Sequence, residues 1–241
     1  MIIMKKNISM IAGCILAVFM SVSLVAQEGS GTIVYEITDA SSDNPQAAQF
    51  AEMMKGNETL VYFKDGMSLT KVNMMGGMIK IDVKQDKEQN LDMLFDAMGQ
   101  KMWVNSPKLE QDRMKAESDN PMEYMEIAYD MDDTKTVAGY ECFKMTVDFP
   151  DVEGVKLEAY VTDQVDVRPA IIQGVDMDEF KGLPLEYVFY NPQMNLTVSA
   201  KSFEETVDPA VFELNTAGYQ KMTMKEFVEL TQQFGGGGFG F

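Results

Sequence analysis

Apolar and polar residues alternate along most of this chain, and three segments show the pattern most clearly. Their apolar positions are Ile79, Ile81 and Val83, then Phe143, Met145, Val147 and Phe149, then Val155, Leu157, Ala159 and Val161. A period of two is typical of antiparallel strands with one face on a core and the other in water. We therefore expect these side chains to be buried on one side of a sheet. Lys80, Lys144 and Lys156 should face solvent, because a one-residue shift of register would invert every position.

Weaker alternation marks further strands around these segments. They are predicted at Thr32–Ile37, Thr59–Lys64, Ser68–Asn73, Leu91–Phe95, Lys101–Asn105, Leu185–Tyr190 and Leu196–Phe203. Short turn sequences such as KDG, MMGG and NPQMN separate the runs and indicate hairpin connections. The pattern predicts an antiparallel meander of about ten strands.

Helical spacing is confined to a few places. A helix over residues 45–55 is predicted by an apolar stripe that consists of Ala47, Phe50, Ala51 and Met54. Thr223 and Glu226 form a capping box for a second helix over residues 223–234. Residues 118–131 predict either a short helix or a loop. The glycine-rich residues 235–241 predict a disordered tail.

The first residues have the layout of a secretory signal peptide. Lys5 and Lys6 precede a long apolar run, which ends near Ala26 where small and polar residues begin. Two alternatives are a lipoprotein that carries its lipid on Cys14 and an uncleaved membrane anchor. The apolar segment before Cys14 is very short, and no polar tether follows that cysteine. We therefore predict cleavage near Ala26 and a periplasmic or secreted mature protein.

With residues 1–26 assigned to the signal peptide, residues 27–234 form a single predicted domain. The chain after residue 26 retains 18 basic and 38 acidic side chains, a net charge of −20. Such a charge repels phosphate backbones and anionic lipid head groups, so nucleic acid is not an expected partner. A stable transmembrane anchor is not expected either. The length is sufficient for a hydrophobic core without disulfide bonds.

The residue types needed for common catalysis are scarce. Histidine is absent, which removes the commonest general base and the commonest metal ligand. We expect no enzyme, no catalytic residues and no cofactor. Cys142 is the one cysteine after residue 26, so no internal disulfide can form. Its thiol is either exposed and reactive or, as we expect, packed under a loop or helix.

Several short motifs resemble a known family. GTIVYEI after the leader, VAGYECFKM in the middle, GLPLEYVFYN, and then DPAVFEL with a later GY occur in that order. They resemble uncharacterised exported envelope proteins of Gram-negative bacteria related to the lipoprotein-carrier (LolA/LolB-like) fold. The resemblance implies a curved, open antiparallel sheet or incomplete barrel, with short helices on its concave face over a hydrophobic cavity. It brings no catalytic residues, and this chain departs from it in lacking a lipid-bearing cysteine.

Methionine is abundant, with 22 in the chain. Its unbranched side chain fills irregular cores and lines surfaces that accept varied apolar ligands, so core filling and a promiscuous cavity are both open interpretations. A third is Cu(I) binding by thioethers, with Met74, Met75 and Met78 or Met122 and Met125 as candidates.

The combined patterns predict a non-enzymatic protein that binds a hydrophobic ligand, such as a lipid, an acyl chain or a lipoprotein, in the cell envelope. The two predicted helices are candidate lids over the cavity. The residues expected to line it are Phe63, Met93, Phe95, Phe143, Met145, Leu157, Tyr187 and Phe189. The alternative is a structural or interaction protein of the envelope, whose own helices fill the same space and leave no room for a ligand.

Overall fold

The protein is built on one large β-sheet. The computed structural model describes residues 23–25, 29–97, 99–117, 124–165, 168–170 and 181–233. The strands in the first half are β1 (Ser23–Val25), β2 (Ser30–Ser41), β3 (Glu58–Lys64), β4 (Met67–Met74), β5 (Ile79–Gln85), β6 (Leu91–Ala97) and β7 (Gln100–Ser106). Those in the second half are β8 (Glu126–Val137), β9 (Tyr140–Asp148), β10 (Lys156–Thr162), β11 (Arg168–Ala170), β12 (Leu183–Tyr190), β13 (Asn195–Glu204) and β14 (Gln220–Met222).

Some of the expected features fall outside the described residues. These are Cys14, the cleavage position near Ala26, Met122 and the glycine-rich tail over residues 235–241. The expectations for them stay predictions.

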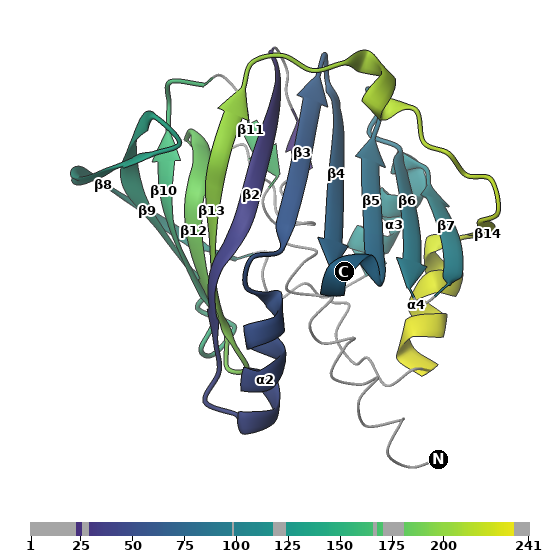
Figure 1. Ribbon diagram of the computed structural model, residues 1–241, viewed down its shortest axis with the longest axis horizontal. Helices are drawn as coiled ribbons and strands as arrows, with labels where there is room; N and C mark the ends of the chain where they lie inside the picture. The colour runs from purple at the N-terminus through teal and green to yellow at the C-terminus, as the bar shows by residue number, and fades with distance from the viewer. Residues whose placement is uncertain are drawn as a thin grey trace.

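Twelve of the strands form a single curved sheet (Figure 1). Its order is β14-β7-β6-β5-β4-β3-β2-β13-β12-β10-β9-β8, so the pairing of β2 with β13 joins the two halves of the chain. Every pair in it is antiparallel except β14 with β7. The sheet ends at β8 and β14 and does not close. The prediction of a mainly β fold with a curved, open sheet is confirmed.

The alternating residues lie as the sequence pattern predicts. Ile81, Phe143, Met145 and Leu157 are buried in one continuous core on the inner face of the sheet. Lys80 is exposed on the opposite face. Lys144 and Lys156 keep 31% and 40% of their side-chain surface in solvent, which confirms the predicted register.

Three α-helices accompany the sheet in the described part of the chain. They are α2 (Pro45–Met54), α3 (Lys108–Glu117) and α4 (Met224–Gln233). The helices predicted over residues 45–55 and 223–234 are confirmed as α2 and α4. Phe50, Ala51 and Met54 of α2 are buried in the core. Phe227 of α4 lies with its ring centroid 5.9 Å from that of Phe95, on the inner face.

The capping box of α4 is formed as predicted. The Thr223 backbone N–H donates to Glu226 Oε2 at 2.8 Å, and the Glu226 backbone N–H donates to Thr223 Oγ1 at 3.2 Å. The hydrogen bonds from Thr223 lower the pKa of Glu226. The carboxylate therefore favours the helix above its ordinary pKa, and this contribution is lost as the pH falls through the lowered value.

We expect Thr223→Ala to lower the free energy of unfolding by about 1 kcal/mol, because one donor of the first helical turn loses its acceptor. Chemical denaturation of the variant and the parent protein measures the difference. Thr216→Ala, in the connection before β14, is the matched control and should change stability less. Equal losses in the two variants would show that the cap does not stabilise α4.

The predicted strand count and the prediction for one segment are wrong. A short helix or a loop is predicted over residues 118–131, of which 118–123 lie outside the described residues. From Glu126 onward the chain instead forms β8, which pairs with β9 on both sides of an irregularity between Asp130 and Thr134. Its alternation is hidden because β8 is an edge strand, mostly exposed on both faces. The short strands β1, β11 and β14 are not predicted either. Three residues give too little sequence for a period to appear.

Helix α3 has no counterpart among the predicted elements. It carries no apolar stripe, and its Leu109 is 62% exposed. A side chain holds the helix in place instead, since Gln111 Nε2 donates to the backbone oxygens of Ser106 at 2.8 Å and Gln89 at 3.0 Å. Polar anchoring of this kind leaves no hydrophobic pattern in the sequence.

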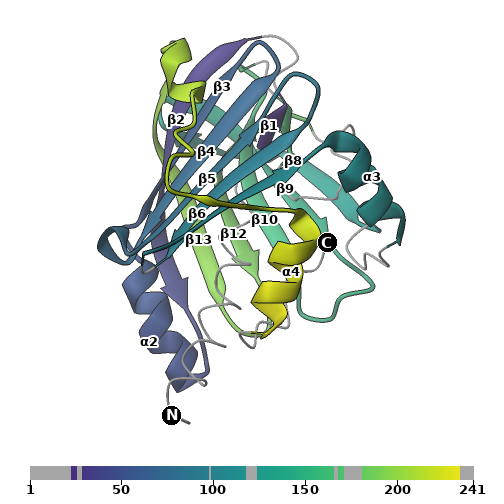
Figure 2. The same cartoon turned by 90° about the vertical axis from the view of Figure 1, so that its right-hand side faces the viewer.

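The outer face of the sheet is crossed by the chain between β13 and β14 (Figure 2). This connection includes the short helix η3 (Pro209–Phe212), which contacts β4. Phe212 is 4% exposed, and Leu69 and Leu94, whose positions put them on the outer face, are also buried. The connection therefore covers apolar residues that the alternation pattern would leave in solvent.

Candidate functional site

The eight residues predicted to line a cavity all lie on the inner face of the sheet. Three belong to the first half of the chain and five to the second half, and all join the same core. Their exposed fractions are Phe63 0%, Met93 2%, Phe95 7%, Phe143 7%, Met145 0%, Leu157 1%, Tyr187 7% and Phe189 5%. The structure thus brings the predicted set onto one apolar surface, and each side chain is covered.

Cross-strand pairing arranges the second-half residues in rows. Leu157 on β10 lies opposite Phe189 on β12. In the next row, Ala159 lies between Tyr187 on β12 and Met145 on β9. The small Ala159 side chain thus lies between two large ones. These residues face the strands β3 to β6 across the interior.

Aromatic contacts connect the core side chains. The Tyr35 and Tyr187 rings meet edge to face with centroids 6.3 Å apart, and Phe143 meets Tyr129 in the same manner at 5.9 Å. The Tyr35 hydroxyl donates to the backbone oxygen of Pro184 at 2.6 Å. Burial raises the pKa of both Tyr35 and Tyr187 well above the ordinary value, so both hydroxyls stay protonated and can donate hydrogen bonds.

A short two-stranded ribbon lies inside the curve of the sheet (Figures 1 and 2). It consists of β1 and β11, paired antiparallel from Ser23 with Ala170 to Val25 with Arg168. β1 lies against β4 and β3. The space between the two halves of the sheet is thus wide enough for extended chain. The sequence does not predict this feature, because residues 23–25 belong to the apolar run of the expected leader.

One row of inner-face residues, at one end of the strands, includes three polar side chains among apolar ones. Phe63, Ser68, Gln85, Leu91 and Ser106 lie opposite one another in successive strand pairs. Ser68 and Ser106 are 3% and 0% exposed. The Ser106 hydroxyl has no hydrogen-bond partner among the described residues. Buried hydroxyls nearly always have one, so Ser106 is a candidate anchor for a polar group of a ligand.

We expect Ser106→Ala to leave stability unchanged or to raise it by up to about 1 kcal/mol, because it removes a buried hydroxyl that gains no hydrogen bond. Thr162→Val is the matched control. Thr162 is also fully buried, but its Oγ1 accepts from the Gln164 backbone N–H at 3.3 Å, so that variant should be destabilised. Equilibrium denaturation measures both. A clear loss for Ser106→Ala would show that its hydroxyl has a partner.

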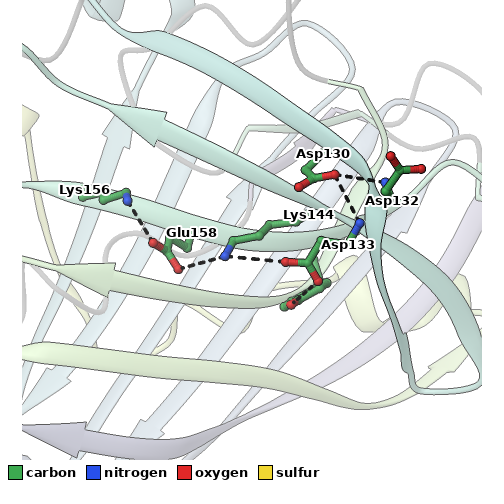
Figure 3. Close-up of polar contacts among 7 residues, drawn as sticks. Asp130, Asp132, Asp133, Lys144, Lys156 and Glu158 are labelled. Atoms are coloured by element: carbon green, nitrogen blue, oxygen red, sulfur yellow. Dashed lines mark hydrogen bonds and ion pairs between the residues drawn. The ribbon is translucent and has the colours of Figure 1, made fainter.

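The outer face of β8, β9 and β10 carries a network of charged side chains (Figure 3). Lys144 Nζ lies 3.6 Å from Glu158 and 3.7 Å from Asp133, and Lys156 Nζ lies 2.9 Å from Glu158. The hydrogen bond from Lys156 lowers the pKa of Glu158. The Tyr160 hydroxyl donates to Asp133 at 3.0 Å. The two ion pairs of Lys144 join neighbouring strands, whereas the Lys156–Glu158 pair lies within β10. All three pairs are partly exposed to solvent, so they contribute little stability.

Cys142 is buried, with 1% of its surface exposed, as expected for a packed cysteine. Its position shares a face with Lys144, but the pairing of β8 with β9 shifts at this point, between Asp130 and Thr134. The shift leaves extra residues in β8, and both Cys142 and Phe143 belong to the hydrophobic core beside it. Burial raises the pKa of the thiol, which makes it less reactive.

A second apolar site lies where α2 meets the β4–β5 turn, and we call it the methionine pocket. It is lined by Phe50, Met53, Met54, Asn57, Met74, Met75 and Ile79. Its cavity has a volume of about 10 Å³, close to what a single water molecule needs. Met74 and Met75 are candidates from the sequence, whereas the contribution of α2 is not predicted.

Clusters of harder ligands are absent from the described part of the chain. No group of three or more histidine, cysteine, aspartate or glutamate side chains there is placed to hold a metal ion. Within the same residues, no helix is both long and apolar enough to span a membrane.

Comparison with known proteins gives similarity at the level of structure only. No protein-family model and no curated protein sequence matches the chain. An uncharacterized conserved protein from Thermus thermophilus is similar at 10% identity and a TM-score of 0.49, over 82% of this chain and 94% of that one. The lipoprotein LppX of Mycobacterium tuberculosis is similar at 7% identity and a TM-score of 0.37, over 83% and 97%.

A third similar structure is an outer membrane lipoprotein-sorting protein domain from Vibrio parahaemolyticus, with 9% identity and a TM-score of 0.21 over 83% of this chain and 96% of that one. Because these three TM-scores lie below 0.5, the site rests on the geometry of the chain itself.

Proposed function

We propose that the protein is an exported, non-enzymatic binding protein of the cell envelope that holds a hydrophobic ligand, a lipid or an acyl chain, inside its curved sheet. The ligand would lie on the inner face, on the surface formed by the eight predicted residues. α4 covers part of this surface, since its buried Phe227 packs against Phe95. Ser106 supplies a hydrogen bond to a polar group of the ligand.

The observation that carries this proposal is the position of β1. Its sequence, Ser-Leu-Val, belongs to the apolar run that we expect to be removed at export, yet it lies inside the curve of the sheet against β4 and β3. Loss of β1 would leave β11 without its partner and the inner face with one strand less. An apolar ligand can then occupy the space that β1 filled, because it would remove the apolar side chains of the inner face from contact with water.

A second candidate is an envelope interaction protein with a filled interior. The burial of all eight predicted residues favours it, since none exceeds 7% exposure. The two proposals differ in one respect. A carrier opens its interior when β1 is removed, whereas an interaction protein stays closed.

Titration with a fluorescent fatty-acid probe separates the two candidates. The exported protein should show saturable binding, and Phe189→Lys should abolish it because a charge would enter the apolar site. Tyr190→Lys, one residue further on the outward-facing register, is the control and should bind as the parent does. Circular dichroism and thermal melting of both variants verify the fold. Failure of the delipidated parent protein to bind the probe would remove the carrier proposal.

A further inference from the structure

The methionine pocket is distinct from the lipid surface proposed above. It lies at the end of the sheet where α2 packs against the turn between β4 and β5. Two thioethers come from adjacent positions at the end of α2, Met53 and Met54, and two from the turn, Met74 and Met75. Met54 and Met74 are 1% and 3% exposed, whereas Met53 is 49% exposed. Four sulfur-bearing side chains therefore line one small cavity that has an open side.

Hydrogen bonds hold both parts of the pocket, the end of α2 and the β4–β5 turn, in place. Asn57 Nδ2 donates to the backbone oxygens of Met53 at 3.1 Å and Met54 at 2.9 Å, which fixes the end of α2. At the turn, Met74 pairs with Ile79 in the β4–β5 ladder. The pocket is thus preorganised by polar contacts that do not use the sulfur atoms.

Met75 is held in an unusual conformation. Its φ is +52°, in the left-handed region that residues other than glycine rarely adopt. Gly76 and Gly77 follow with φ of +66° and +88°. These glycines adopt left-handed φ values without strain, whereas Met75 does not. Strained backbone at a side chain that lines a cavity is found more often at binding sites than elsewhere.

Water is a poor occupant for this cavity. A buried water needs two to four polar partners. The only polar side chain in the lining is Asn57, and its amide nitrogen already donates to two carbonyls. Thioethers are weak hydrogen-bond acceptors but good ligands for soft monovalent cations. A soft monovalent cation can therefore be coordinated by the four sulfur atoms, which give a water molecule only weak hydrogen bonds.

We propose that the methionine pocket binds a soft monovalent metal ion, Cu(I) or Ag(I), through the thioethers of Met53, Met54, Met74 and Met75. The net charge of −18 favours the approach of cations. Hard divalent ions are excluded because the lining offers no carboxylate, imidazole or thiolate. The inference does not depend on lipid binding, because the lipid surface and this pocket use different side chains.

Silver(I) is the probe, since it shares the ligand preference of Cu(I) and is not oxidised in air. Titration of the full chain, labelled with ¹³C at its methionine methyl groups, should give one equivalent of binding and shift the methyl signals of the four pocket methionines. Met54→Leu with Met74→Leu conserves side-chain volume, so the protein should stay folded, and its affinity should fall about tenfold or more.

Met78→Leu is the matched control. Met78 follows the same turn and is 52% exposed, but it does not line the pocket, so its replacement should leave the affinity unchanged. Absence of stoichiometric binding, or equal affinity in the parent and the double variant, would overturn the proposal. The fatty-acid titration of the double variant should match the parent, which keeps this test separate from that of the carrier.

Discussion

Phe143→Ala is expected to lower the free energy of unfolding by about 3–5 kcal/mol, the range for buried aromatic side chains that leave a cavity. Phe143 is 7% exposed on the inner face of β9, opposite Val161 of β10. Its ring meets that of Tyr129 on β8 with centroids 5.9 Å apart. The substitution therefore removes packing between three strands at one edge of the sheet.

Lys144→Ala provides the control on the opposite face. Lys144 makes two ion pairs of 3.6 and 3.7 Å, both in partly exposed surroundings, so its loss should cost about 1 kcal/mol or less. Urea denaturation of both variants measures the contrast. Comparable losses at residues 143 and 144, or a loss well under about 1 kcal/mol for Phe143→Ala, would contradict the assignment of inner and outer faces.

Gly182→Ala should be the second strongly destabilising substitution. Gly182 has a φ of +83°, where an alanine side chain costs about 1–2 kcal/mol. A Cβ atom there would lie 2.6 Å from the backbone oxygen of Thr162, which cannot move without disturbing the end of β10. The clash adds about 1–3 kcal/mol, so the total should reach several kcal/mol.

Gly218→Ala isolates the backbone contribution. Gly218 has a similar φ of +81°, but no atom lies within 4 Å of the position of its Cβ. This variant should lose only the conformational part, about 1–2 kcal/mol. Thermal melts of the two variants give the comparison. Losses of equal size would mean that the contact with Thr162 relaxes and that β10 and β12 are not fixed at this end.

The sequence was sufficient for the strands with one wet face. Over residues 79–83, 143–149 and 155–161 every second side chain is apolar, and the burial of Ile81, Met145 and Leu157 follows from that period. The two helices with an apolar stripe could be predicted equally well, because an apolar stripe at helical spacing is typical of a helix that packs on a core. The eight lining residues could be placed on the inner face for the same reason.

What the sequence could not provide depends on contacts between distant segments. The edge strand β8 has no buried face to impose a period, and α3 is held by side-chain hydrogen bonds from Gln111. The methionine pocket combines α2 with a turn some twenty residues later, and no local pattern predicts that meeting. Burial of Leu69 and Leu94 requires knowledge of the segment that crosses the outer face.

The most direct test of the carrier proposal is native mass spectrometry of the protein purified after export from a bacterial host. We predict a polypeptide that begins near Gln27, carries no diacylglycerol on Cys14, and retains a noncovalent adduct of lipid mass that organic solvent releases. The proposal would be contradicted if the exported protein is detected without any lipid adduct and also binds no fatty acid after gentle delipidation.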